Sequence, residues 1–176
     1  MSERGHITLV TGGARSGKSA LAERLAARHG GSRIYIATAE VGDDEMSHRI
    51  AEHQRRRGTG WITLEEPLDL TGALDRSDGQ GVRLVDCLTL WLANCRGSAD
   101  IGALCMTLRQ QTCPVVLVTN ELGQGIVPDN ALARRFRDRH GWMNQAVAQI
   151  ADQVWLSVSG QPMRLKPPRE NPDDIL

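Results

Sequence analysis

The eight residues from Gly12 to Ser19, Gly-Gly-Ala-Arg-Ser-Gly-Lys-Ser, constrain the fold of this chain more than any other stretch. They fit the pattern G-x-x-x-x-G-K-[ST], in which glycines let successive backbone N–H groups turn inward on a phosphate. In that pattern the lysine, Lys18, supplies a mobile positive charge for the outer phosphates, and the Ser19 hydroxyl ligates Mg²⁺. The stretch predicts a phosphate-binding loop.

The flanking residues place this loop in the context that its chemistry needs. Residues 7–11 are mainly β-branched and apolar, which predicts a buried strand, and residues 20–28 are strong helix formers. A loop at a helix N-terminus also gains from the helix dipole, which favours an anion. The alternative is an ordinary glycine-rich turn between a strand and a helix.

The rest of the chain alternates between strand and helix patterns. Helices are expected over 43–57, from Pro67 to Leu74, and over 88–95, 101–112 and 131–151, the last with a candidate break near Gly141. Strands are expected over 33–37, 61–65, 82–86, 114–119, 154–158 and 163–166, with a hairpin turn at 160–162.

This order predicts the α/β fold class of a P-loop NTPase (RecA-like). Its sheet is mostly parallel, with helices on both faces and one antiparallel edge hairpin strand. We expect a single nucleotide-binding catalytic domain over 1–166. The remainder, 167–176, is rich in proline and acidic residues and is expected to be disordered.

Composition narrows the classes of partner and compartment. The 176 residues carry 21 basic and 21 acidic side chains, so no net charge favours nucleic acid or an anionic membrane. The four cysteines lack zinc-ligand spacing and are expected to be free thiols. With no signal peptide pattern and no apolar run of transmembrane length, a cytoplasmic protein is expected.

Asp86 ends an apolar strand, where a carboxylate can hold Mg²⁺ beside Ser19. The alternative is an aspartate that only caps the following helix.

No Asn-Lys-x-Asp guanine signature occurs, and the nearest match, at 119–122, lacks the lysine, which counts against a switch GTPase. The connection 120–130 is too long for a simple link and is a candidate substrate loop.

His53 falls on the same face of the expected helix as Met46 and Ile50. A histidine on an apolar face is usually a buried core residue. Arginines surround it in sequence, however, and a neutral imidazole near a bound triphosphate is a phosphorus nucleophile. Position alone therefore favours a core residue, and the surrounding arginines keep the nucleophile interpretation open.

Five motifs together resemble one family, and the likeness covers about Ile7 to Lys166. They are Gly-Gly-Ala-Arg-Ser-Gly-Lys-Ser (12–19), Ile-Ala-Thr-Ala (36–39), Asp-Asp-Glu-Met (43–46), Arg-Ile-x-x-His (49–53) and Val-Thr-Asn-Glu-Leu-Gly-x-Gly-Ile-Val-Pro (118–128). Val-Trp-Leu-x-Val-Ser-Gly at 154–160 belongs to the same likeness. The sequence resembles the bifunctional adenosylcobinamide kinase/adenosylcobinamide-phosphate guanylyltransferases of cobalamin biosynthesis.

The resemblance implies two reactions. A hydroxyl of adenosylcobinamide attacks the γ-phosphate of ATP or GTP, and a histidine then attacks the α-phosphate of GTP and passes GMP to adenosylcobinamide phosphate. By position, His53 is the guanylylated histidine and Lys18 the loop lysine, with Mg²⁺ at Ser19 and Asp86. The implied nucleotide contacts are Gly12, Gly13, Ala14, Arg15, Ser16, Gly17, Lys18, Ser19, Thr38, Ala39, Glu40, Gln54, Arg55, Arg56, Arg57, Glu65 and Asp86.

One departure concerns the residue before His53, where relatives carry a second histidine and this chain has Glu52. The resemblance also implies a homo-oligomer, namely a trimer. The alternatives are a P-loop small-molecule kinase without guanylyltransferase activity, and a nucleotide-binding regulator that processes no small molecule.

Overall fold

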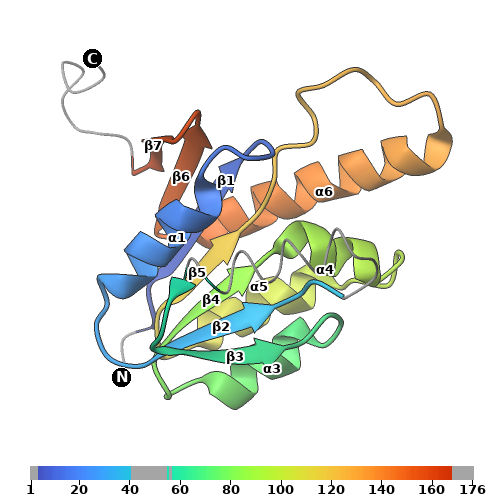
Figure 1. Cartoon of the computed structure of the whole chain (residues 1–176). Coiled ribbons are helices and arrows are strands. Elements are labelled where there is room, and N and C mark those ends of the chain that lie inside the picture. The colour runs from blue at the N-terminus through green and yellow to red at the C-terminus, as the bar shows by residue number, and fades with distance from the viewer. Residues whose placement is uncertain (1–3, 41–54, 56, 168–176) are drawn as a thin grey trace.

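The computed structural model describes residues 4–40, 55 and 57–167. These residues form a seven-stranded sheet with the order β3-β2-β4-β5-β1-β6-β7, in which only β7 is antiparallel to its neighbour (Figure 1). The strands are β1 (Ile7–Gly12), β2 (Arg33–Ala37), β3 (Trp61–Glu65), β4 (Val82–Asp86), β5 (Val115–Val118), β6 (Gln153–Val158) and β7 (Gln161–Lys166). The expected α/β class and the antiparallel edge strand are confirmed.

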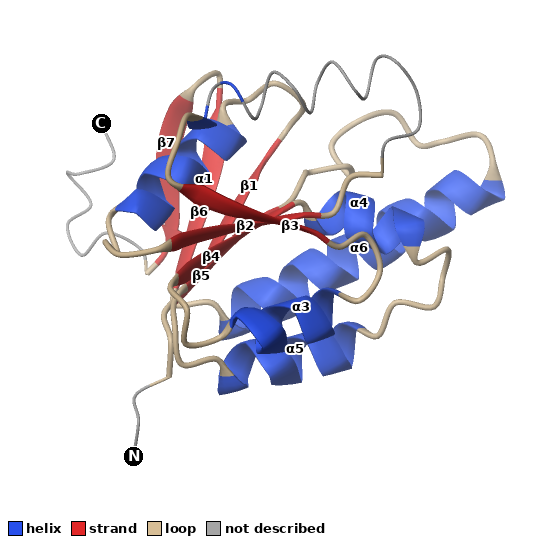
Figure 2. Cartoon of the chain, turned by 60° about the horizontal axis from the view of Figure 1, so that its bottom comes forward, coloured by secondary structure: helices blue, strands red, loops and turns tan. Residues whose placement is uncertain are grey.

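Helices cover both faces of this sheet, as Figure 2 shows. One face carries α1 (Lys18–Ala27). The other carries α3 (Leu70–Ser77), α4 (Leu88–Asn94), α5 (Ile101–Gln110) and α6 (Ala131–Ile150). No helix in the described ranges is long and apolar enough to cross a membrane.

Two apolar layers, one on each face of the sheet, hold these helices in place. Successive residues of a central strand point to opposite faces, so each central strand contributes side chains to both layers. On β5, Val115 and Leu117 pack toward α3 to α6, whereas Val116 and Val118 pack toward α1. All four residues are fully buried, because β5 is a central strand with both faces covered. This explains why the strand reads as a continuous apolar run.

The observed elements differ from the predicted ones at several points, and side-chain contacts explain two of the differences. Helix α3 begins after Asp69, not at Pro67, because the Asp69 carboxylate caps the N–H of Gly72 at 2.9 Å. Helix α6 runs unbroken through Gly141, since the buried residues on either side, His140 and Met143, anchor it to the sheet. The hairpin turns at Ser159 and Gly160, so β7 already includes residues 161 and 162.

Register brings the expected site residues to one edge of the sheet. Glu65 and Asp86 both pair with Ala37, from opposite sides of β2, and Asp86 also pairs with Val118. In a parallel sheet all these strands end at the same edge, so the carboxylates lie level with the end of β1. The loop 12–19 leaves that same edge (Figure 1).

Candidate nucleotide and metal site

The loop 12–19 has the shape that its glycines predict. Gly17 has φ of 91°, in the left-handed region, and a Cβ on Gly12 would overlap the Ser157 carbonyl oxygen and the Ser16 hydroxyl. Helix α1 begins directly after Gly17 and has neither a side-chain cap nor an acidic residue in its first turn. Its N-terminal N–H groups therefore offer an anion site at the loop.

Lys18 and Ser19 lie in the first turn of α1, next to this site. The Lys18 ammonium donates to the carbonyl oxygen of Gly13 at 3.0 Å, so it lies over the loop. The Ser19 side chain is half-buried. The buried Ser16 hydroxyl has no hydrogen-bond partner in the described part of the chain, so it is a candidate donor to a phosphate bound in the loop.

Residues from the far end of the chain support the loop. The Ser157 hydroxyl donates to the Ser16 carbonyl oxygen at 2.7 Å, and the N–H of Gly160 donates to the same oxygen at 2.9 Å. A Cβ on Gly17 would come within 3.2 Å of Gly160 Cα. The hairpin between β6 and β7 therefore packs directly against the phosphate loop, a contact that the sequence analysis missed.

Asp86 ends β4, and its carboxylate accepts a hydrogen bond from the Tyr35 hydroxyl at 2.9 Å. Burial, and next the charge of Asp86, raise the pKa of Tyr35 far above its ordinary value. Tyr35 therefore stays protonated and acts as a donor to the carboxylate. Tyr35 was not predicted as a site residue, because it lies on β2, 51 residues from its partner.

Arg57 reaches the same corner. Its guanidinium carbon lies 3.4 Å above the centre of the Tyr35 ring. Its Nε and Nη1 are buried without a hydrogen bond to any described residue. Arg57 thus stacks on the Tyr35 ring, whose hydroxyl bonds Asp86 at the carboxyl end of β4, and we call these three residues the Tyr35–Asp86–Arg57 stack.

The other predicted contacts differ in their surroundings. The Thr38 side chain is fully buried, where its hydroxyl accepts from the N–H of Cys87 and donates to the Cys87 carbonyl, each at 2.7 Å. Thr38 therefore fixes the chain just after Asp86. Ala39 is half-buried, and Glu40, Arg55 and Glu65 are exposed. His53, Gln54 and Arg56 lie outside the described residues.

The residues present fit Mg²⁺. A serine hydroxyl and one carboxylate are hard oxygen donors, and Mg²⁺ characteristically takes few protein ligands and completes its shell with phosphates and water. No cluster of three or more metal-ligating side chains occurs in the described ranges. Ser19 and Asp86 are the residues that would hold the ion.

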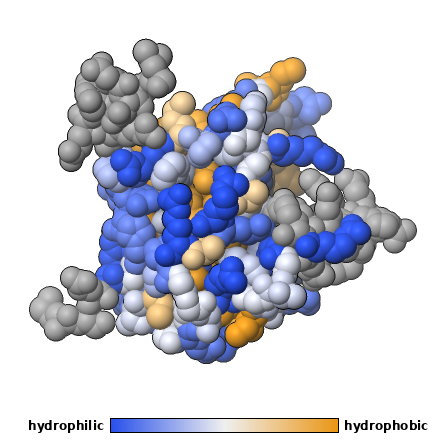
Figure 3. All heavy atoms as spheres, turned by 60° about the vertical axis from the view of Figure 1, so that its left-hand side comes forward, coloured by the Kyte–Doolittle hydropathy of each residue, from blue (hydrophilic) through white to orange (hydrophobic). Residues whose placement is uncertain are grey.

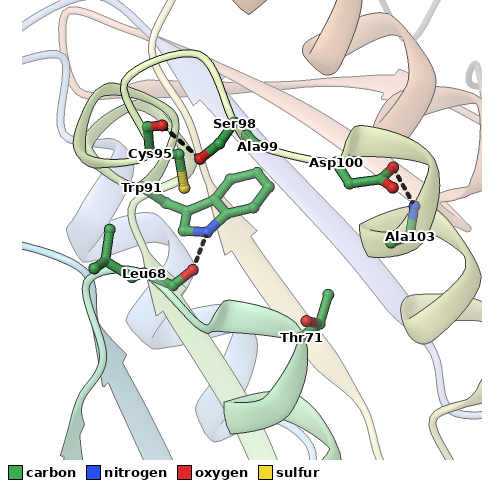
Figure 4. Close-up of a pocket in the computed structure, with 8 residues that line it drawn as sticks. All are labelled: Leu68, Thr71, Trp91, Cys95, Ser98, Ala99, Asp100 and Ala103. Atoms are coloured by element: carbon green, nitrogen blue, oxygen red, sulfur yellow. Dashed lines mark hydrogen bonds between the residues drawn. The ribbon is translucent and has the colours of Figure 1, made fainter.

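A hollow of about 270 Å³ lies elsewhere, between α3, α4 and α5 (Figure 4). The Trp91 indole on its wall donates to the Leu68 carbonyl at 2.9 Å, and the Asp100 carboxylate caps Ala103. None of the predicted site residues lines it. Because these polar groups are already paired, the hollow offers little to orient a ligand.

Comparisons with known proteins show the family of this chain. A family model described as "Cobinamide kinase / cobinamide phosphate guanyltransferase" matches residues 8–165. The chain is 50% identical over 167 residues to "Bifunctional adenosylcobalamin biosynthesis protein CobP" of Pseudomonas aeruginosa, covering 90% of this chain and 96% of that one. It is 40% identical over 182 residues to "Bifunctional adenosylcobalamin biosynthesis protein CobU" of Salmonella typhimurium, covering 91% and 99%.

Among solved structures, the RadB recombinase aligns with a TM-score of 0.44 at 16% identity, over 87% of this chain and 74% of that one. The family model, by contrast, matches residues 8–165, and the two relatives align over at least 90% of this chain and of their own length. The chain belongs to the cobinamide kinase/cobinamide phosphate guanyltransferase family.

Proposed function

We propose that this protein phosphorylates adenosylcobinamide with ATP or GTP, and then transfers GMP from GTP to adenosylcobinamide phosphate through a guanylyl-histidine at His53. The products of the second step are adenosylcobinamide-GDP and pyrophosphate. Family membership supports both activities, because the family description names both. It does not favour the alternatives of a kinase alone or a non-catalytic regulator.

The observation that carries the proposal is the meeting of the phosphate loop and the Tyr35–Asp86–Arg57 stack at one edge of the sheet. The loop amides and Lys18 would bind the β- and γ-phosphates, and Arg57 has two buried N–H groups available for an oxyanion. When bound, Mg²⁺ at Ser19 and Asp86 neutralises phosphate charge. These groups would lower the barrier for both displacements.

Arg57 also bears on the nucleophile. His53 precedes it by four residues, so the covalent chain alone keeps their Cα atoms within about 14 Å of each other. This short covalent connection supports the proposal that His53 acts near the stack. Attack of the imidazole on the α-phosphorus forms a P–N bond and breaks the bond to pyrophosphate, and the attack of adenosylcobinamide phosphate then restores the free histidine.

The two activities are tested by following label into the corrinoid. With γ-labelled ATP and adenosylcobinamide, we expect labelled adenosylcobinamide phosphate. With α-labelled GTP and unlabelled adenosylcobinamide phosphate, we expect labelled adenosylcobinamide-GDP. Label transfer in the first reaction without the second would support a kinase alone, and transfer in neither would contradict the proposal.

We also propose a homo-oligomer, a trimer by resemblance. Leu122, Ile126, Val127 and Leu132 are exposed on the loop after β5 and on the start of α6, with Ile126 98% exposed. Figure 1 shows this arm extending well beyond the sheet. The side of the molecule seen in Figure 3, by contrast, is mostly hydrophilic with small separate hydrophobic areas. Exposed apolar side chains gathered on a projecting arm favour burial against another copy.

Light scattering tests the assembly. A trimer would have three times the chain mass of 19.3 kDa, and Ile126→Asp with Val127→Asp should shift the protein toward the single chain mass. A measured mass equal to that of a single chain for the wild-type protein would contradict the proposal.

A further inference from the structure

Glu121 joins the phosphate loop to the loop expected to bind substrate. It follows β5 by three residues, and its N–H donates to the carbonyl oxygen of Gly12 at 3.2 Å. Two residues before Glu121, the N–H of Thr119 donates to the carbonyl oxygen of Val10 at 2.9 Å. The chain leaving β5 therefore continues alongside β1 until the phosphate loop begins.

The half-buried Glu121 carboxylate is held by one oxygen only. Its Oε1 accepts from the Thr11 hydroxyl at 2.6 Å and from the Asn144 amide at 3.4 Å, and both donors are buried. No hydrogen bond from another described residue reaches Oε2. One oxygen is anchored and the other is available, which is the arrangement of a positioned base.

A buried polar network behind Glu121 fixes the direction of this anchoring. The Asn144 oxygen accepts from the Thr119 hydroxyl at 2.7 Å, and its amide nitrogen donates to the Asn120 carbonyl at 2.9 Å. This assignment turns the amide N–H groups, and not the oxygen, toward Glu121. Next to it, His140 Nε2 lies 2.9 Å from the Thr89 hydroxyl.

The network adds no second charge. His140 is 1% exposed, and burial lowers its pKa although the charge of Glu121 opposes this. The imidazole is therefore neutral, and Glu121 is the charged member of the network. Its carboxylate is placed at the loop without a neutralising partner within the network.

We infer that Glu121 is the general base for the phosphorylation step, an inference that rests on the proposed function. In that step the acceptor oxygen forms a bond to the γ-phosphorus, the bond from that phosphorus to the departing nucleoside diphosphate breaks, and the hydroxyl proton passes to Oε2 of Glu121. The first displacement of guanylyl transfer needs no such base, because a neutral imidazole attacks directly.

Its position distinguishes Glu121 from the other carboxylates of this edge. Glu65 ends β3, four strand spacings from β1, or about 19 Å. Asp86 is held by Tyr35 and has the place of a metal ligand. Glu121 adjoins Gly12 through the backbone and Thr11 through the side chain.

The test compares Glu121→Gln with the wild-type protein in two separate reactions. Glutamine keeps the shape and still accepts from Thr11, but it cannot take a proton. We expect phosphorylation of adenosylcobinamide to fall by about 100-fold in kcat, within the range for general base catalysis. The KM for ATP, and labelling of the protein by α-labelled GTP without corrinoid, should stay unchanged. Asp138→Asn, which alters an exposed carboxylate on α6, is the matched control.

The outcomes separate this inference from the proposed function. If Glu121→Gln phosphorylates adenosylcobinamide with the same kcat as the wild-type protein, the inference is overturned. An equal loss of phosphorylation and self-labelling would also overturn it, because that result would make Glu121 a support of the loop alone. If the wild-type protein phosphorylates adenosylcobinamide but takes no label from GTP, the transferase proposal fails while the kinase comparison still tests Glu121. A wild-type protein that does neither overturns both.

Discussion

Replacing Tyr35 with phenylalanine tests whether its hydroxyl holds Asp86 in position. The change removes the 2.9 Å hydrogen bond to the Asp86 carboxylate but keeps the ring beneath Arg57. Because the Tyr35 side chain is only 6% exposed, the new phenyl ring should pack as the old one did.

The structure sets the expected magnitude. A hydrogen bond to a charged group contributes about 1.5–3 kcal/mol, and we take the lower value because Asp86 is half-buried and water can replace the hydroxyl. If that energy orients the carboxylate for the metal, affinity for the Mg²⁺–nucleotide complex should fall about tenfold. Because the pKa of Tyr35 is raised by burial, the effect should not depend on pH.

The assay is calorimetric titration with nucleotide, once with Mg²⁺ and once with excess chelator. Tyr35→Phe should weaken binding only when Mg²⁺ is present, since the hydroxyl acts through Asp86. Tyr35→Leu, which also removes the ring beneath Arg57, should weaken binding in both titrations. Equal nucleotide affinity for Tyr35→Phe and the wild-type protein in Mg²⁺ would refute the reasoning.

Three further predictions concern the loop and the stability of the sheet. Asp78→Ala leaves the fully buried Arg83, 2.9 Å from that carboxylate, without its ion-pair partner, and should lower the free energy of unfolding by about 3–5 kcal/mol in urea titration. Ser157→Ala removes one of two hydrogen bonds on the Ser16 carbonyl, and should raise the Kd for nucleotide about fivefold, equivalent to about 1 kcal/mol. Burial lowers the pKa of His140 below its ordinary 6.5, so the folded protein resists protonation and the free energy of unfolding should fall as the pH drops below that value. His140→Gln should reduce this pH dependence.

The predictions for Asp78→Ala and Ser157→Ala each have a matched control. Asp138→Ala breaks an exposed ion pair with Arg137 and should lower the free energy of unfolding by less than about 1 kcal/mol. Ser98→Ala removes an exposed hydroxyl that bonds Cys95 and should leave nucleotide binding unchanged. Equal effects of Asp78→Ala and Asp138→Ala, or of the two serine variants, would contradict the account. An unaltered pH dependence in His140→Gln would show that other groups cause it.

Local patterns predicted the elements of the fold because its strands and helices are short and strongly patterned. The apolar runs at 82–86 and 115–118 and the glycines of the loop each have a local physical cause. They predicted the end of β4, with Asp86, and the start of α1, with Lys18 and Ser19, where the structure has them. The rules for parallel sheets then predicted a mostly parallel sheet with an antiparallel edge strand, but not the order of its strands.

The supporting contacts could not be predicted in this way. Tyr35 and Ser157 looked like ordinary strand residues, and each acquires its role from a partner 51 or 141 residues away. Asn144 lies on a helix whose pattern indicates burial, but nothing local shows that its amide faces Glu121. Such roles depend on register across the sheet, which sequence periodicity does not encode residue by residue.

The central claim, that His53 carries GMP, is tested most directly by labelling the protein alone. The protein is incubated with Mg²⁺ and GTP labelled on either the α- or the γ-phosphate, denatured, and examined for bound label beside His53→Asn. We predict that only the α-label is retained, that acid releases it, and that His53→Asn retains none. Absence of protein-bound label, or equal labelling of His53→Asn, would contradict the account.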